Sequence, residues 1–113
     1  KEKNIMFILA DAENTPLGYE SCDVIICFAC FPHFHDKKKA TMVLSHILKQ
    51  KGFLIVAHFD SSQGINKHHA SCKAVMHDRL PDKAVMEDLF QTAGLNILQF
   101  IDEQGFYYIS ATK

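Results

Sequence analysis

The sequence is poor in arginine, and it has neither a long apolar run nor an excess of positive charge. Arg79 is the single arginine among twelve basic residues, and the formal net charge is −1. Surfaces that bind nucleic acids or anionic membranes carry a basic excess, and arginine supplies the paired donors that read phosphates and bases. No apolar stretch approaches the about 20 residues of a membrane-spanning helix. We therefore expect neither a nucleic acid nor a membrane as partner.

A secretory leader and a disulfide framework are also missing from the sequence. The apolar stretch near its start, residues 5–10, is shorter than the apolar region of about 7–15 residues in a signal peptide. The first residue is not methionine, so we interpret the chain as processed or as a piece of a longer one. The few cysteines lie mostly within apolar stretches, unlike the dense cysteines of small secreted domains. We expect them to be buried free thiols in a reducing cytoplasm. They are Cys22, Cys27, Cys30 and Cys72.

The remaining composition is that of one folded domain. The chain has 113 residues, of which 48% are hydrophobic and nine are phenylalanine. One domain is typical of this length, and about two thirds of the surface that the unfolded chain exposes can be buried. This apolar content excludes disorder as the main state of the chain.

Continuous apolar runs of strand length alternate with helical patterns. Three runs are apolar on both faces, which is typical of strands in the middle of a parallel sheet. They are residues 4–10, 23–29 and 52–59. Two further runs, residues 95–101 and 106–111, flank a short polar loop that contains Gly105, and they predict an antiparallel hairpin.

Three segments show helical spacing. The first has Asp36 as its N-cap and Gly52 at the C′ position. The second covers residues 63–77, and the third begins with Pro81 and ends at Gly94. Strands that alternate with helices predict an α/β fold in three layers, with a mainly parallel sheet and a C-terminal antiparallel hairpin.

Short motifs occur in a fixed order along the chain. They are DAENTP at 11–16, CDVIIC at 22–27, FPHF at 31–34, LKQKGFL at 48–54, and LP, LF and AGL between 80 and 95. In type, order and spacing they resemble the class I S-adenosylmethionine-dependent methyltransferases of the subgroup called type 11. Gln50 and Lys51 depart from the LKPGG pattern of that family. The resemblance implies a Rossmann-like sheet in the order 3-2-1-4-5-7-6.

The family's Gly-rich turn and its ribose-binding acid have no counterpart in the sequence, because all five glycines are isolated. The resemblance therefore implies that residues 1–113 form a single domain, the C-terminal half of such an enzyme. Residues 23–29 would then have a bare apolar edge, which is a template for another chain. We expect a homodimer or a complex with the missing N-terminal half, although residues 5–10 could also move next to this edge.

Four residues are cofactor candidates because of the resemblance. Asp11 would accept from the adenine amino group of S-adenosylmethionine, with the Ala12 backbone N–H beside it. Phe28 and Ala29 end the fourth strand of the family's sheet, and ligands of open α/β sheets bind outside such strand ends. A turn-forming aspartate and ordinary core residues are the alternative interpretations.

Several of the seven histidines follow the strand at 52–59 or lie beside it. Methyl transfer needs a positioned acceptor and at most a general base. We predict His58 or His69 as that base, and we expect His33, Phe59 and His68 to line the pocket of a small-molecule methyl acceptor. Structural histidines and core aromatic residues are the alternative.

Two further patterns have weaker support. His68, His69 and Cys72 could offer ligands to zinc, but their spacing matches no zinc signature, so we expect no bound metal. Cys27 and Cys30 form a C-x-x-C pair, but a thioredoxin-like role needs the first cysteine at a helix N-terminus. The expected function is thus methyl transfer to a small molecule by the complete enzyme. We expect the isolated chain to be inactive. The alternative is a non-catalytic interaction or subunit module that retains the fold.

Overall fold

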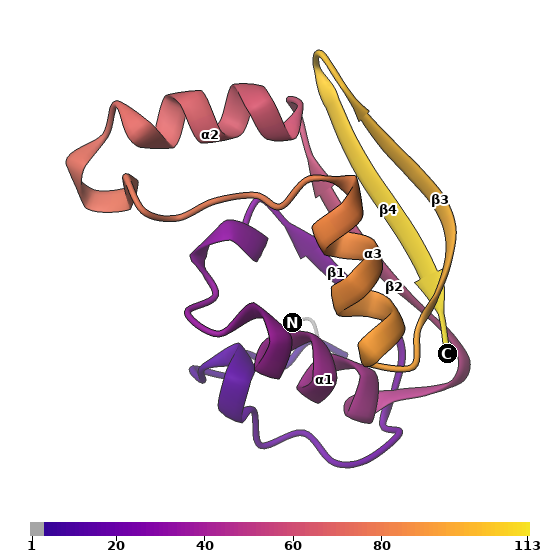
Figure 1. The fold of residues 1–113 in the computed structure, drawn as a ribbon. Coiled ribbons are helices and arrows are strands. Elements are labelled where there is room, and N and C mark those ends of the chain that lie inside the picture. Colours follow the sequence, from indigo (N-terminus) through magenta and orange to yellow (C-terminus); the bar gives the residue numbers. More distant parts are fainter. Residues whose placement is uncertain (1–3) are drawn as a thin grey trace.

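Within the described part of the chain, four strands form one open sheet in the order β1-β2-β4-β3 (Figure 1). The computed structural model describes residues 4–113. β1 (Cys22–Phe28) runs parallel to β2 (Leu48–His58), whereas β2 and β3 (Asn96–Glu103) both pair antiparallel with β4 (Phe106–Thr112). This is the order 4-5-7-6 of the last four strands in the sheet that the resemblance implies. The C-terminal hairpin is confirmed.

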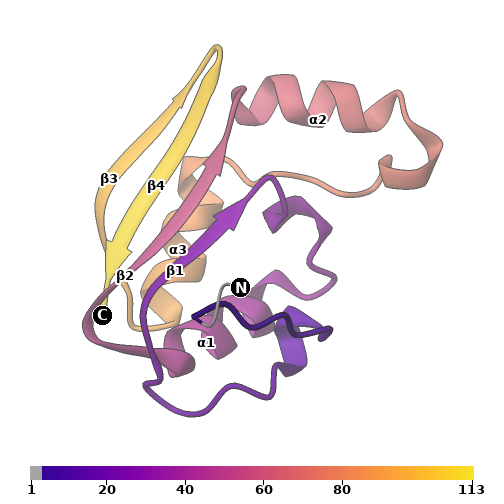
Figure 2. The same ribbon diagram turned by 180° about the vertical axis from the view of Figure 1, so that it is seen from behind.

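Residues 4–113 contain three α-helices, and two of them pack on the same face of the sheet. They are α1 (Lys37–Ile47), α2 (Ser62–Ala70) and α3 (Lys83–Thr92). α1 and α3 contact each other and lie over one face in both views, whereas α2 extends from the end of β2 beyond the sheet (Figures 1 and 2). Short 3-10 helices occur in the connections: η1 (Ala12–Asn14), η2 (Phe31–His33) and η3 (Lys73–Val75).

The hydrophobic core lies between the sheet and the helices α1 and α3. Its largest fully buried side chains include Tyr107, Phe31, Phe90, Leu48 and Leu54. The α/β class is confirmed, but the sheet is mixed, because one of its three strand pairings is parallel. Residues 4–113 form two layers rather than three. In the fold that the resemblance implies, the helices on the second face belong to the N-terminal half. The sequence has no counterpart of that half.

Helix α1 begins where the sequence predicts. Asp36 is its N-cap, and its carboxylate accepts a hydrogen bond from the Lys39 backbone N–H at 3.0 Å. Lys37, in the first turn, donates from Nζ to the carbonyl oxygens of Pro32 and Phe34 at 3.0 and 3.1 Å. A cation near a helix N-terminus is unfavourable, and these bonds offset that cost while they fix η2 against the helix.

The end of α1 differs from the prediction. The helix ends at Ile47 and passes directly into β2, so Gly52 lies within a strand and is not the C′ residue. A Cβ atom at Gly52 would lie 2.7 Å from the carbonyl oxygen of Asp23 in β1. Glycine is therefore required here for close approach of the two strands. The residue with left-handed backbone in this region is Lys51, with φ 64°.

Residues 4–10 do not form the predicted strand. Their side chains are exposed, and Phe7 and Leu9 retain 93% and 105% of their reference exposure. A strand needs a hydrogen-bonded neighbour, and no described strand pairs with this segment. The move of residues 5–10 next to β1 is thus not seen, and β1 remains an edge strand of the sheet.

The predicted helix at 63–77 is shorter in the structure, and the next helix begins later than predicted. α2 ends at Ala70, and a loop with η3 follows. Asn66 of α2 binds this loop through two hydrogen bonds with Leu80. Its Oδ1 accepts from the Leu80 backbone N–H at 2.6 Å, and its Nδ2 donates to the Leu80 carbonyl oxygen at 2.9 Å. Pro81 precedes α3, whose N-cap is Asp82. Gly94 ends α3 with φ 78°, as predicted.

Candidate functional site

The carboxyl ends of β1 and β2 lie side by side because these strands are parallel. η2 follows β1, and α2 follows β2, so the histidines of both segments come to the same end of the sheet. The loop between α2 and α3 returns past this end (Figure 1), and Asp78 lies in this loop. In open α/β sheets ligands bind at such strand ends, and we take this end as the candidate site.

His33 and Asp78 form the closest polar contact of the site. Nδ1 of the His33 imidazole lies 2.7 Å from Oδ2 of Asp78. Nδ1–H donates to the carboxylate in this arrangement, which leaves Nε2 of a neutral imidazole as a proton acceptor. The hydrogen bond from His33 holds the pKa of Asp78 below its usual value, and the charges of His33, Lys37 and His69 act in the same direction. Both side chains are partly exposed, so solvent reaches the pair.

His69 joins this pair from α2. Its Nδ1 lies 2.9 Å from the backbone carbonyl oxygen of Asp78, and its ring centroid lies 5.2 Å from that of His33. His68 is exposed and its ring centroid lies 6.2 Å from that of His69. The structure thus brings the predicted base His69 together with the predicted acceptor-side residue His33, and His68 lies at the margin of the group.

His58 occupies a different environment at the end of β2. Its side chain is 4% exposed, and its Nε2 has no hydrogen-bond partner in residues 4–113. Burial, together with the charges of His69 and His33, lowers the pKa of His58 to about 4. Its ring packs edge-on against Tyr107, with centroids 6.0 Å apart. A buried imidazole with this pKa is a weak base, so the geometry favours His33 and His69 for proton transfer.

The aromatic side chains at the strand ends form a pair. Phe28, the last residue of β1, packs edge-on against Phe59 with ring centroids 5.1 Å apart, and both side chains are exposed. The next residue, Ala29, donates its N–H to the carbonyl oxygen of Ala57 at 3.0 Å and has φ 55°. The left-handed backbone of Ala29 turns the chain away from the sheet and into η2. Phe28 and Phe59 therefore present an exposed apolar surface at the carboxyl ends of the two strands.

The two remaining cofactor candidates lie in another part of the structure. Asp11 caps η1, with Oδ1 at 3.4 Å from the N–H of Glu13. Asp11 and Ala12 line a cavity of about 360 Å³ together with Cys22 and Val24 of β1. The Asp11 side chain is exposed, and its contact with the adenine amino group stays a prediction. This cavity does not include Phe28 or Ala29, so the structure separates the four residues into two groups.

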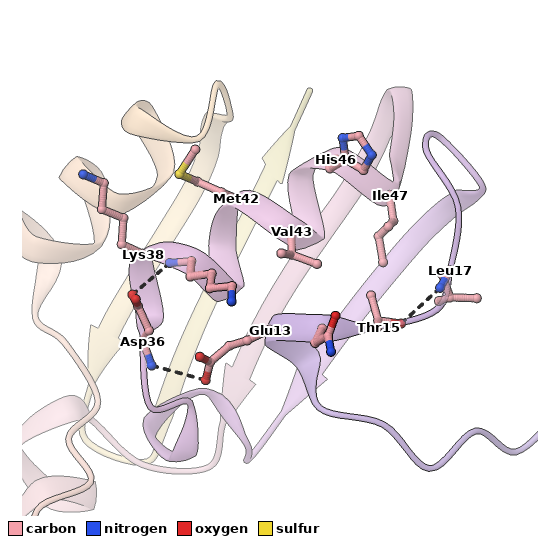
Figure 3. A pocket seen from close by; sticks show the side chains of 11 residues that line it. Glu13, Thr15, Leu17, Asp36, Lys38, Met42, Val43, His46 and Ile47 are labelled. Atoms are coloured by element: carbon pink, nitrogen blue, oxygen red, sulfur yellow. Dashed lines mark hydrogen bonds between the residues drawn. The ribbon is translucent and has the colours of Figure 1, made fainter.

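A cavity of about 550 Å³ lies between η1 and α1, and it is lined by His46 but by none of the histidines of the candidate site (Figure 3). Leu17, Met42, Val43 and Ile47 supply its apolar lining. Glu13 closes one side, because its Oε2 accepts from two backbone N–H groups that precede α1. None of the site residues expected from the sequence lines this cavity. Among the described residues that line this cavity, no imidazole is hydrogen-bonded to a carboxylate, in contrast to His33 and Asp78 at the strand ends. We therefore place the candidate chemistry at the strand ends.

Within residues 4–113, no three or more His, Cys, Asp or Glu side chains are grouped so that they could hold a metal ion. No helix in the same range combines the length and the apolar character needed to cross a bilayer. The absence of bound zinc stays a prediction.

Asp78 is the site residue that the sequence analysis missed. It is separated from His33 by 45 residues and directly follows the segment 63–77 that was predicted to be a helix. An aspartate in such a segment has no distinguishing local pattern. The adjacent histidine-rich stretch was the only signal, and it did not identify a partner for His33.

The first half of the chain matches a family of known proteins. Residues 1–56 match the methyltransferase domain family. The uncharacterized methyltransferase YcgJ of Bacillus subtilis is 38% identical over 58 residues, which cover 50% of this chain and 23% of that protein. The similarity thus includes η1, β1, α1 and most of β2.

Solved structures resemble the whole chain. A methyltransferase from Thermotoga maritima, described as dependent on S-adenosylmethionine, has a TM-score of 0.76 at 24% identity and covers 95% of this chain. A methyltransferase from Haloferax volcanii, solved in complex with an activator protein, has a TM-score of 0.83 at 15% identity and covers 99%. The chain spans 64% and 63% of these two structures. The chain thus covers less than two thirds of the length of each of these two structures and of YcgJ.

The sequence match and the shared fold agree with each other. The family match covers the segment with the DAENTP and CDVIIC motifs, and the structural similarity extends to the hairpin. The comparisons confirm the resemblance drawn from the sequence, and the chain belongs to the class I S-adenosylmethionine-dependent methyltransferases.

Proposed function

We propose that the chain supplies the acceptor side of an S-adenosylmethionine-dependent methyltransferase that acts on a small molecule. The observation that carries this proposal is the hydrogen-bonded pair of His33 and Asp78, with His69 against it, at the carboxyl ends of two parallel strands. This position is where ligands of open α/β sheets bind. The pair has the chemistry of a general base beside a methyl acceptor.

In this proposal Asp78 orients the base and His33 accepts the proton. The carboxylate of Asp78 holds Nδ1–H of His33, so the lone pair of Nε2 is free to take a proton from an acceptor oxygen, nitrogen or sulfur atom. His69, fixed through the Asp78 carbonyl, is the second candidate base. The exposed rings of Phe28 and Phe59 would contact the apolar part of the acceptor. S-adenosylmethionine would supply the methyl group.

Cofactor binding by the isolated chain is expected to be weak. Asp11 and Ala12 offer contacts for adenine, and Phe28 and Ala29 would lie near the rest of the cofactor. The sequence has no Gly-rich turn that lets a backbone approach the methionine part of the ligand. We propose that a homodimer or a complex with the missing N-terminal half completes the binding site, and that the protein works in the cytoplasm.

A chimera can test this function. Residues 1–113 would be joined to the N-terminal part of YcgJ, which is related over 58 residues. We expect transfer of a labelled methyl group to a panel of small amines, phenols and thiols. His33→Ala and Asp78→Asn should lower the rate by about 10²–10⁴-fold, whereas the matched change His35→Ala should not. Equal rates in all variants of a chimera that binds the cofactor would overturn the role of the pair.

The second candidate function is a non-catalytic interaction or subunit module. The isolated glycines favour it, because a chain without the cofactor turn can retain the fold without the activity. The coding sequence upstream of Lys1 discriminates between the two functions. A strand followed by a Gly-rich turn there supports the enzyme, and an unrelated domain or a stop codon supports the module.

A further inference from the structure

Two cysteines are brought together where β1 ends. Cys27 is the last residue of β1 that faces the core, and its side chain is 4% exposed. Cys30 follows three positions later and packs against the same core cluster as Cys27. Between them, Ala29 remains bonded to β2 through its N–H while its φ of 55° reverses the chain direction. This turn returns the Cys30 side chain to the side of the sheet on which Cys27 lies.

The two thiols have unequal environments. Cys30 is partly exposed, whereas Cys27 is buried, and both are free thiols. The hydrogen bond with the Cys27 thiol and the nearby charge of His33 together lower the pKa of Cys30 to about 7, against the effect of burial. The same contact and burial raise the pKa of Cys27. The accessible sulfur is thus the better thiolate, and the buried one remains a thiol.

We propose that Cys27 and Cys30 form a peroxide-sensitive modification site that closes reversibly to a disulfide. The Cys30 thiolate attacks a peroxide oxygen, the O–O bond breaks, and a sulfenic acid and one water are produced after uptake of a proton. The Cys27 sulfur then attacks the Cys30 sulfur, and the hydroxyl group leaves as a second water with the Cys27 proton. In total two thiols and one hydrogen peroxide give one disulfide and two waters.

The other cysteines serve as internal controls. Cys72 is exposed, so accessibility alone would make it the first thiol to react. Cys22 lies at the start of β1, at the opposite end of the strand from Cys27. Selective oxidation of Cys30 would therefore report the arrangement of the pair rather than exposure. The site differs from thioredoxin-type chemistry, since the α-helix after Cys30 begins only at Lys37.

The test uses the intact chain and does not depend on the proposed methyltransferase activity. The reduced protein would be treated with one equivalent of hydrogen peroxide, and its peptides would be mapped by mass spectrometry. We expect a loss of about 2 Da in the peptide that holds both cysteines, with reversal by dithiothreitol. Iodoacetamide should label Cys30 about tenfold faster than Cys72 at pH 7. First oxidation at Cys72, or no linkage between Cys27 and Cys30, would overturn the proposal.

Two variants separate the steps. Cys30→Ser should abolish the disulfide and lower the rate of peroxide consumption to that of Cys72. Cys27→Ala should stop the reaction at a sulfenic acid on Cys30, which dimedone traps, and Cys72→Ser should react as the unchanged chain does. Circular dichroism would confirm the fold of each variant. If Cys27→Ala unfolds, the labelling rates of the unchanged chain still decide the order of reactivity. Persistent disulfide formation in Cys30→Ser would contradict the assignment.

Discussion

Nδ1 of His33 lies 2.7 Å from Oδ2 of Asp78, and this contact ties η2 to the loop between α2 and α3. The same loop is held by His69 at the Asp78 carbonyl and by the two hydrogen bonds between Asn66 and Leu80. A segment with little secondary structure is therefore fixed at three neighbouring points. The candidate base and the loop that orients it are one unit, so a change in either residue should be detected at the other.

The first prediction concerns the tautomer of His33. Asp78→Asn should remove the acceptor that holds Nδ1–H, so the neutral imidazole should shift toward the Nε2–H form. Nitrogen-15 chemical shifts of the imidazole measure the two forms directly. In His33→Ala the pKa of Asp78 should rise toward its ordinary value, because its main hydrogen-bond donor is lost. Asp88→Asn, an exposed change on α3, is the control. An unchanged tautomer in Asp78→Asn would show that the contact does not orient the ring.

The second prediction concerns acid stability. Burial lowers the pKa of His58 to about 4, whereas an unfolded histidine titrates near 6.5. The unfolded state therefore binds more protons between these values, and stability is lost as the pH falls from about 6.5 to 4. The shift corresponds to about 3 kcal/mol in the free energy of unfolding.

The variant His58→Leu tests the source of this loss. Denaturant unfolding at pH 7 and pH 5 should show a smaller difference in the variant than in the unchanged chain. At pH 7 the variant should be as stable or more stable, because it removes a buried Nε2 without a partner. His77→Leu, at an exposed position, should keep the full pH dependence. An identical pH dependence in His58→Leu would assign the effect to other groups.

The third prediction concerns Glu13, whose carboxylate links η1 to α1. Its Oε2 accepts from the backbone N–H groups of His35 and Asp36 at 3.0 and 3.2 Å. Glu13→Ala should destabilise the chain by about 1–2 kcal/mol, since two donors beside a helix N-terminus lose their acceptor. Hydrogen exchange at these two amides should accelerate, and Glu13→Gln should restore part of the protection. Glu87→Ala, on α3, should leave both amides unchanged.

Much of the fold followed from local sequence patterns. The apolar runs of β1 and β2 and the polar loop with Gly105 predicted strands that the structure confirms, since their pairing partners lie in the same chain. Asp36 predicted the start of α1, because N-capping depends on one side chain and a nearby amide. These features need little information from distant residues.

The errors have a common physical cause, which is dependence on distant partners. Residues 4–10 are as apolar as β1, but an apolar run becomes a strand only beside another strand. Gly52 has the residue type of a helix C-cap, yet its role is set by the approach of Asp23 in β1. Asp78 acts through His33, and no spacing along the chain relates the two residues. The candidate site was therefore located by its histidines but not by its orienting carboxylate.

The last prediction is association through the uncovered side of β1. Val24, Ile26 and Phe28 point away from the helices and remain 49%, 64% and 51% exposed, and β1 is an edge of the sheet. An apolar edge strand pairs readily with another chain, and a two-fold dimer closes such a contact most simply.

Light scattering at low micromolar concentration should give a mass above that of one chain. Ile26→Lys should reduce it to one chain, because a charge would then be buried in the contact. Leu98→Lys is the matched control, since Leu98 is 57% exposed on β3, at the opposite edge. A soluble monomer with cooperative unfolding, or equal dissociation in both variants, would show that the exposed edge does not drive association.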